Sequence, residues 1–559
     1  MECKEIKKYK VNHKIFSNAK YCFFKIIPAF IIAFVISFMF FIYEPLVVYS
    51  SNTEDFWFDF SALITNNLIF LGSSVLIATI FSIIIYVFSK IIKKEFVYDW
   101  YLLLFSTVFI VTYIQGNYLA SSLPTLDGSP INWDSYTKQC ITSIILCLVV
   151  LIINITLYIK IKNNYKKAIS YISLGILAML TISLIPILSS NPQIYNKKGV
   201  YASTLDNYNK LSSNSNFVIL LVDMEDSRTF QKVLEDTGKT ELLKDFTYFP
   251  DTLSAYPFTR ESIPFVLSGE WYEAETNIND YYNKALNESK LIEDLKSRNY
   301  DVNIYEQDLF WTDKKALEIE NIQIVNSKMD LSTFFKQEAK YTMFKYLPFP
   351  LKKYSSIETL NYNNCRMEES AKKLFKSDNQ EAYNALDKIS IQEKNYFQFI
   401  HTDGGHYPWD TNGKFEKIEN GTYEDKIEAS ITYIEKYINR IKESNQYDNT
   451  AIILMADHGN NGYEPVGRQN PILYIKGKNE KHDKMAISNK KVSYDDLNKS
   501  IYNDLLDGKK SDELLKDIDD NRIRRFIWYK DYDDMEEQIL DGHAWETEKL
   551  VSTGKKYKR

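Results

Sequence analysis

The chain has 559 residues, a formal net charge of −6 at pH 7 and a mean hydropathy of −0.29. This length exceeds one ordinary domain, and the small net charge without a basic block argues against a nucleic-acid-binding protein. Only one of the five cysteines, Cys365, lies beyond residue 190, so no disulfide can form within that part and no cysteine-based zinc site is predicted. The average hydropathy hides two halves, because residues up to about Ser190 are rich in Ile, Leu, Phe and Val.

Five apolar stretches in the first half are each long enough to cross a bilayer, which takes about 20 residues. They cover approximately residues 26–43, 64–88, 101–117, 139–159 and 168–189. Buried core helices are the alternative, but five such runs in succession favour membrane helices. The first run is not a cleavable signal peptide, because four more runs follow it and no small-residue cleavage site does. We therefore predict a transmembrane domain over residues 1–190.

The orientation of these helices follows from the lysines of the short loops, since cytoplasmic loops carry the excess of Lys and Arg. Lysines gather before the first span, after the second and after the fourth, at Lys4, Lys7, Lys8, Lys10, Lys14, Lys20, Lys90, Lys93, Lys94, Lys160, Lys162, Lys166 and Lys167. The N-terminus is therefore predicted to be cytoplasmic, and five crossings place everything after Ser190 outside. The loop from Gln115 to Tyr136 is on the same side, either as an interfacial segment that guides a lipid head group or as a plain connection.

The second half reads as an α/β domain. Residues 191–215 are polar and read as a linker, and residues 216–559 read as one folded domain. Strand-like and helical segments then alternate, which is typical of a mostly parallel sheet. The strand-like segments are 216–223, 301–305, 396–401, 451–456 and 471–476, and the helical ones are 290–298, 423–443 and about 494–506. Residues 310–390 and the aromatic C-terminal segment from about Arg522 receive no assignment.

Two acids follow predicted strands, at the edge where open parallel sheets bind ligands. Asp223 ends the first apolar strand, and Asp457 ends the strand 451–456 and is followed by His458 and Gly459. Carboxylate oxygens with an imidazole nitrogen suit zinc or manganese. Together the two strand ends predict a metal site.

A hydroxyl residue opens a short apolar helix after a proline-containing loop, in the segment from Asp251 to Gly269. Thr259 stands at that start, where free backbone N–H groups and the helix dipole stabilise anions. Its hydroxyl could attack a phosphorus atom, but a plain helix N-cap threonine is the alternative. Farther along, His401 and His406 follow a strand and could bind phosphate oxygens or protonate a leaving group, with exposed loop histidines as the alternative.

In this order, these four pieces resemble the sulfatase-type branch of the alkaline-phosphatase superfamily. With its five-span anchor, the chain is similar to phosphoethanolamine transferases and lipoteichoic acid synthases. The resemblance implies that residues 216–559 are a catalytic domain with an alkaline-phosphatase/sulfatase-like fold outside the membrane. It also implies one divalent metal, Zn or Mn. It makes Asp223 a metal ligand with Glu225 as the fallback, and Asp457, His458 and Thr259 the other ligands.

The same resemblance assigns the remaining site residues. The run Ser262-Ile-Pro264 with Ser268-Gly269 points to Thr259 as the nucleophile, and the run His401 to Pro408 matches a second motif with His401 and His406 in catalytic roles. Arg260, Arg468 and Ser262 are assigned to substrate binding. The family's further histidine, about a dozen residues after Asp-His-Gly, is absent here, and Arg468 takes its place in the prediction. Ser254 and Ser262 remain alternative nucleophiles.

The resemblance implies metal-dependent transfer of a phospho-head group, phosphoethanolamine or phosphoglycerol, through a phosphothreonine. The donor would be a membrane phospholipid and the acceptor a cell-surface glycan, lipid or polymer. A sulfatase-like phosphoester or sulfate ester hydrolase is the alternative, although Ala255 and Val266 stand where a sulfatase motif needs its nucleophile and its arginine. A non-catalytic envelope assembly protein is the third hypothesis. We expect a multi-pass protein of a bacterial plasma membrane, and the missing disulfides favour a Gram-positive owner.

Overall fold

The computed structural model describes residues 25–558, except residues 52, 54–55, 120–122, 124–130, 163, 196–199, 326–327, 356–358, 368–372, 461–467, 517, 520 and 532–533. The lysines before residue 25, residues 120–122 and 124–130 of the loop from Gln115 to Tyr136, and the stretch 462–467 therefore lie outside the described residues. The chain divides into two compact units. The helical unit comprises residues 1–199 and 327–368, and the α/β unit comprises residues 200–326 and 369–559.

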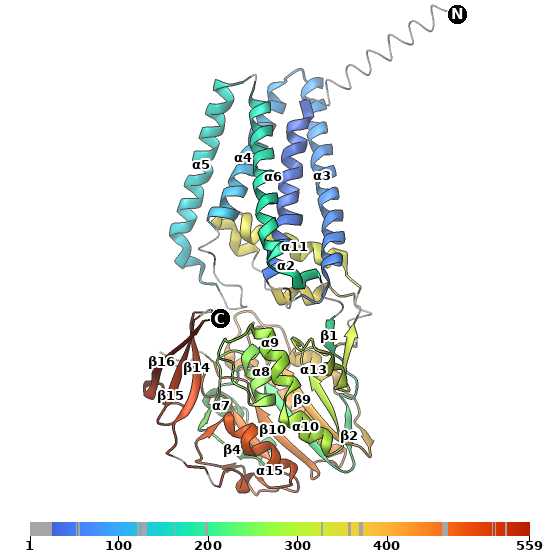
Figure 1. The fold of residues 1–559 in the computed structure, drawn as a ribbon, viewed down its shortest axis with the longest axis vertical. Coiled ribbons are helices and arrows are strands. Elements are labelled where there is room, and N and C mark those ends of the chain that lie inside the picture. The colour runs from blue at the N-terminus through green and yellow to red at the C-terminus, as the bar shows by residue number, and fades with distance from the viewer. Residues whose placement is uncertain are drawn as a thin grey trace, which may run out of the picture. The chain divides into compact units, whose positions relative to one another are not determined.

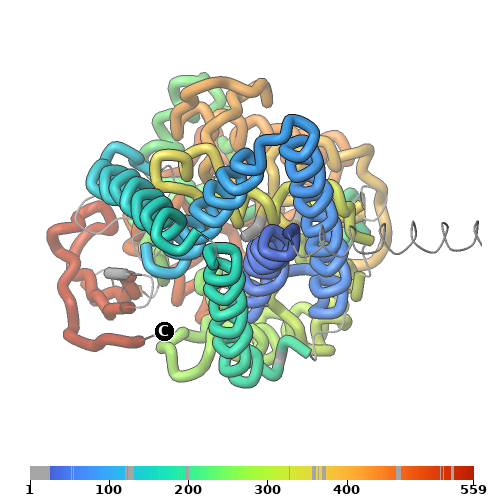
Figure 2. The backbone as a smooth tube through the Cα atoms, turned by 90° about the horizontal axis from the view of Figure 1, so that it is seen from above, coloured from blue at the N-terminus to red at the C-terminus, as the bar shows by residue number. Residues whose placement is uncertain are grey.

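The helical unit contains five helices that are long and apolar enough to cross a membrane, which confirms the five predicted runs. They span Lys25–Ser51, Phe60–Ile91, Phe96–Tyr118, Trp133–Lys160 and Tyr165–Ser189. The first contains the π-turn η1 (Met39–Tyr43) and α2 (Glu44–Ser51), and the others contain α3 (Phe60–Ile91), α4 (Phe96–Tyr118), η4 (Trp133–Tyr136) with α5 (Thr137–Lys160), and α6 (Tyr165–Ser189). Figure 1 shows α3 to α6 alongside one another, and Figure 2 shows them end-on. Large apolar side chains such as Ile77 and Ile152 point outward, as lipid-facing helices require.

The boundary of the helical unit differs from the predicted one. Residues 327–368 pack with the N-terminal helices, although the sequence prediction placed them in a continuous domain over 216–559. They form α11 (Leu331–Tyr346), η8 (Phe349–Tyr354) and η9 (Thr359–Cys365). The side chain of Asp330 caps α11 by accepting the N–H groups of Ser332 and Thr333. The physical reason is aromatic packing, since Phe334 and Tyr362 bury their rings against Phe58.

A seven-stranded sheet forms the centre of the α/β unit, in the order β12-β4-β11-β10-β3-β9-β6. Its strands are β3 (Asn216–Val222), β4 (Thr247–Tyr248), β6 (Tyr300–Tyr305), β9 (Asn395–Thr402), β10 (Thr450–Met455), β11 (Leu473–Lys476) and β12 (Ala486–Ile487). All pairs are parallel except those that β11 makes with β10 and β4. The predicted α/β class with a mostly parallel sheet is therefore confirmed. The carboxyl ends of β10, β3, β9 and β6 lie at one edge.

Helices cover both faces of this sheet. For this reason β3 is buried on both sides, and its sequence is a continuous apolar run. Alternate residues of β3 face two separate cores. On one face lie α8 (Thr259–Ser268), α9 (Ile278–Asn287), α10 (Lys290–Ser297) and α15 (Tyr502–Leu506), and on the other lie α7 (Ser227–Asp236) and α14 (Tyr423–Glu443). In Figure 1, α8, α9 and α10 are seen together in front of the sheet.

Smaller elements complete the α/β unit. The predicted linker contains β1 (Val200–Ser203) and β2 (Lys210–Ser212), which pair with β7 (Ile322–Val325) and β8 (Ser390–Gln392). These pairings make the second part of that stretch a portion of the folded unit. The C-terminal segment forms an antiparallel sheet of β14 (Arg524–Asp531), β15 (Asp534–Leu540) and β16 (Leu550–Lys558). Other short elements include β5 (Thr252–Leu253), β13 (Val492–Ser493) and α13 (Asn379–Ala385).

Candidate metal centre and active site

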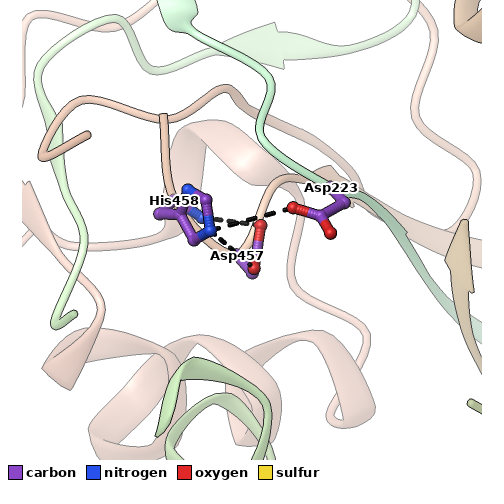
Figure 3. A group of neighbouring side chains, drawn as sticks. All are labelled: Asp223, Asp457 and His458. Carbon is purple, nitrogen blue, oxygen red and sulfur yellow. Dashed lines mark hydrogen bonds and ion pairs between the residues drawn. The ribbon is translucent and has the colours of Figure 1, made fainter. Parts of the chain in front are cut away.

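Two neighbouring strands bring three candidate ligands together. Asp223 follows β3 and Asp457 follows β10, and these strands are paired in parallel register up to Leu221 and Met455. Asp223, Asp457 and His458 each offer one ligand atom, and these atoms lie within 4.8 Å of one another. Figure 3 shows the His458 ring facing both carboxylates. Its Nε2 atom is 3.3 Å from Asp457 Oδ2 and 3.8 Å from Asp223 Oδ1.

The donor set fits a divalent cation. His458 Nδ1 lies 2.8 Å from the carbonyl oxygen of Gly459. This contact requires the proton on Nδ1 and leaves the Nε2 lone pair toward the carboxylates. Asp223 Oδ1 and Asp457 Oδ2 are buried without a hydrogen-bond partner among the described residues. Two buried carboxylates with unused oxygens are costly unless a cation compensates them, so we conclude that these residues are suited to hold one.

The electrostatics of the two acids differ. Burial would raise the pKa of Asp223, but the neighbouring His406, His401 and His458 hold that pKa below its usual range. Burial and then the charge of Asp223 raise the pKa of Asp457. Asp457 Oδ1 accepts the backbone N–H groups of Met224 and His458, at 3.1 and 2.8 Å. These bonds fix the carboxylate so that its other oxygen faces the cluster.

Thr259 lies at the cluster. It is the first residue of α8, and its Oγ1 atom is 3.4 Å from Asp223 Oδ2. The N-cap of α8 is Phe258, which makes no side-chain cap bond, so the alternative of a plain N-cap threonine does not hold. The first backbone N–H groups of α8 have no partner within the helix and face the end where Thr259 stands. The Thr259 hydroxyl therefore lies both beside the metal-type cluster and at a helix end that stabilises anions.

A buried histidine and an acid that the sequence prediction missed form the other side of the site. His401 belongs to β9, beside Leu221 of β3. Its Nδ1 atom lies 2.6 Å from Glu306 Oε2, and its Nε2 atom lies 3.7 Å from Asp223 Oδ2. Burial would lower the pKa of His401, but Glu306 and Asp223 raise it well above its usual value. The signal for Glu306 was available, because it directly follows the predicted strand 301–305.

The loop after β9 holds His406 close to the same acids. Gly404 has a φ of +49°, and a Cβ atom there would lie 2.4 Å from the carbonyl oxygen of Asp223. Only glycine allows this approach. His406 Nδ1 donates to the carbonyl oxygen of Tyr407 at 2.7 Å, which leaves Nε2 available. Burial lowers the pKa of His406, but Asp223 and Asp403 raise it above its usual value.

Other predicted residues are not gathered in the cluster. Glu225 is fully buried, and its carboxylate lies near Ser430 and Lys426 of α14 instead. The Ser262 hydroxyl is buried and donates to the carbonyl oxygen of Tyr256. Arg260 donates to Asn279 and lies over the ring of Phe310, 4.4 Å from its centroid.

Arg468 lies beside the loop that leads to Thr259. It donates to the carbonyl oxygen of Pro257 and packs over Phe258. The residues just before it, 461–467, lie outside the described part of the chain. Its predicted role in substrate binding stays a prediction.

Comparison with known proteins gives one family and several distant structures. A structure titled Ps i-CgsB has 16% identity and a TM-score of 0.39, over 59% of this chain and 83% of that one. An alkaline phosphatase superfamily protein from Vibrio parahaemolyticus has 15% identity and a TM-score of 0.34, over 64% and 85%. The periplasmic domain of EcEptC from Escherichia coli has 12% identity and a TM-score of 0.31, over 62% and 96%. No curated protein sequence matches the chain significantly.

The family assignment rests on a match to a family model rather than on these structures. The sulfatase model matches residues 215–494, half of the chain. This range includes β3, Thr259, His401, His406 and the Asp457–His458 pair. The predicted sulfatase-type branch of the alkaline-phosphatase superfamily is thereby confirmed, and the chain belongs to the sulfatase family.

Proposed function

We propose that the protein is a membrane phosphotransferase. It moves phosphoethanolamine or phosphoglycerol from a membrane phospholipid to a glycan, lipid or polymer of the cell envelope, through a covalent phosphate on Thr259. One observation carries this proposal: the Thr259 hydroxyl lies 3.4 Å from Asp223 at the edge of a buried cluster suited to a divalent metal. The five apolar helices on the same chain support a lipid donor.

The proposed reaction has two displacements at phosphorus. In the first, Thr259 Oγ forms a bond to phosphorus while the bond to the diacylglycerol oxygen breaks, and His401 or His406 returns the proton lost by Thr259 to the leaving oxygen. In the second, an acceptor hydroxyl attacks the phosphothreonine, Thr259 Oγ leaves, and the proton moves back by the same route. A divalent ion, Zn or Mn, held by Asp223, Asp457 and His458 would lower the pKa of the Thr259 hydroxyl and neutralise phosphoryl charge.

The N–H groups at the start of α8 and the ring of His401 would bind the phosphoryl oxygens. The free N–H groups at the start of α8 stabilise negative charge there. His401 is held through Nδ1 by Glu306 and presents Nε2 toward Asp223. These groups would orient the phosphoryl group for attack by Thr259.

The test is the intact mass of the full-length protein purified from a lipid-containing host. We expect wild type to carry a fraction with the added mass of a phosphorylated head group, which identifies the donor. Thr259→Ala should lose this fraction, whereas Ser254→Ala and Ser262→Ala should keep it. An adduct that persists in Thr259→Ala would refute the nucleophile. An adduct that forms on wild type but passes only to water, for every envelope acceptor supplied, would favour the hydrolase alternative.

A further inference from the structure

The segment 327–368 lies at one end of the membrane-helix bundle. It contacts residues near the end of the first span, the start of the second, the end of the third and the start of the fourth. The contacts join Lys345 to Glu44, Phe334 to Phe70, Tyr346 to Gly116, and Phe349 to Ser143. Successive spans run in opposite directions, so these four places lie at the same end of the bundle. By the same alternation, it is the end from which the chain leaves the fifth span.

The depth of the segment can be bounded from α3. This helix has 32 residues, which gives a length of about 48 Å, against a hydrocarbon layer of about 30 Å. If the helix is centred in the layer, about 9 Å projects at each end. Phe70 lies about 15 Å from the start of the helix, so it reaches just inside the hydrocarbon. Phe334 and Phe335, which contact Phe70, are therefore at the boundary between head groups and acyl chains.

A buried ion pair fixes the segment in this place. Glu44 has 0% of its surface exposed, and its two carboxylate oxygens lie 2.6 and 2.7 Å from Lys345 Nζ. The Tyr346 hydroxyl donates to the same carboxylate at 2.8 Å. Lys352 Nζ donates to the carbonyl oxygens of Phe344 and Lys345, near the end of α11. Because the carboxylate is fully satisfied, this cluster is a structural latch and holds α11 in one position.

The outward face of α11 is apolar along one side and basic along the other. Leu331, Phe335 and Met343 are 42%, 43% and 45% exposed. At about 100° per residue they span an arc of roughly 120°. The exposed Lys336 and Lys340 continue this arc. In water, these three large apolar side chains would stay exposed to solvent. At a membrane surface, acyl chains would cover them, and lipid phosphates would attract the two lysines.

The surrounding surface continues this pattern. The Phe335 ring packs on Phe41 of the first span and Phe70 of the second. Trp133 contacts Phe344, and Tyr136 stacks on Phe349. Trp and Tyr gather at membrane–water interfaces. Thus α11 joins the lipid-facing surface of the spans to an aromatic girdle at the start of the fourth.

We propose that residues 327–368, although inserted in the sequence of the α/β unit, form an in-plane membrane element. Helix α11 lies in the head-group layer of the leaflet at its end of the bundle, with Phe335 and Met343 against acyl chains and Lys336 and Lys340 at lipid phosphates. The Glu44–Lys345 latch holds it there. The partner is the lipid surface itself, and the inference does not depend on the reaction proposed for Thr259.

The test uses full-length protein in lipid nanodiscs, with the native cysteines replaced by alanine and an environment-sensitive fluorophore on single cysteines. We expect labels at Phe335→Cys and Met343→Cys to lose most of their emission when lipids carry a nitroxide near the head-group end of the acyl chain. A label at the exposed control Lys414→Cys should keep its emission and be quenched by aqueous iodide instead. Labels at 335 and 343 that behave like the control would overturn the proposal.

The latch is tested on the same labels. In a Lys345→Met background, we expect the label at 335 to lose its lipid quenching and become accessible to iodide. The control variant Lys90→Met, which breaks the exposed Lys90–Glu95 pair of the same unit, should leave lipid quenching in place. Unchanged quenching in Lys345→Met would overturn the role of the latch. The labels at 335 and 343 in the chain that keeps Lys345 decide the membrane position independently.

Discussion

The latch of the helical unit and the metal-type cluster of the α/β unit both bury charged side chains, but only the latch pairs them fully. In the helical unit, both oxygens of Glu44 accept hydrogen bonds from Lys345, and the Tyr362 hydroxyl donates to Glu338. In the α/β unit, Asp223 and Asp457 each keep one buried oxygen without a partner among the described residues. A satisfied buried charge contributes to structure, whereas an unsatisfied one is kept at a cost in stability. Two such carboxylates that face each other beside a histidine therefore mark the candidate functional site.

The substitution Asp457→Asn tests this comparison with the largest expected effect. We expect phosphoester cleavage to fall about 10³-fold or more, because the bound ion supplies several kcal/mol of charge stabilisation. In the presence of a chelator, the variant should be at least as stable as wild type, since one of two facing buried carboxylates loses its charge. The measurements are the initial rate and the thermal midpoint with and without chelator. A variant that is inactive because it is unfolded would contradict the comparison.

The opposite behaviour is expected at the latch. Lys345→Met leaves Glu44 buried without its partner, which costs about 3–5 kcal/mol. We expect this loss in a denaturant titration of the detergent-solubilised protein. Lys90→Met breaks the exposed Lys90–Glu95 pair of the same unit and should change little. Equal effects of the two variants would show that the latch is not a structural ion pair.

The histidine side of the site predicts a smaller effect. Glu306→Gln keeps the shape but removes the charge that orients and protonates His401, so we expect a loss of about 10- to 100-fold in rate with metal content unchanged. The alkaline limb of the pH–rate profile should move to lower pH, because the pKa of His401 falls. Asp301→Asn, near the start of β6, the strand that ends just before Glu306, is the control. A changed metal content would place Glu306 in the metal cluster instead.

The smallest effect concerns pH and the helical unit. Burial raises the pKa of Glu338 to about 8, so its neutral form is favoured in the folded protein. This contribution to stability is complete below the unfolded pKa near 4.3 and is lost as pH rises to about 8, on the order of 1 kcal/mol per pH unit. Unfolding midpoints at pH 6 and pH 8 should therefore differ, and Glu338→Gln should reduce the difference. An equal difference in the variant would exclude Glu338 as its source.

The sequence predicted those parts of the molecule in which local pattern and fold agree. Five apolar runs and the buried run before Asp223 are set by burial alone, and they appear as helices and as β3. Glu306 was missed because its partner His401 is distant in sequence and only the parallel pairing of β6 with β9 brings the two strands together. The packing of residues 327–368 with the helical unit was not predicted for a similar reason. Helix α11 is stabilised by contacts with helices about 300 residues earlier in the chain. The burial of the Ser262 hydroxyl was not predicted, because the face on which a helix buries a hydroxyl depends on packing.

The most direct test of the central claim is the metal content of the purified protein. Wild type should contain one divalent ion per chain, and Asp223→Asn, Asp457→Asn and His458→Gln should each lose it. Glu225→Gln should retain it, because this buried acid faces α14 rather than the cluster. If the cluster variants keep the ion, or if Glu225→Gln loses it, the site described at the ends of β3 and β10 is wrong.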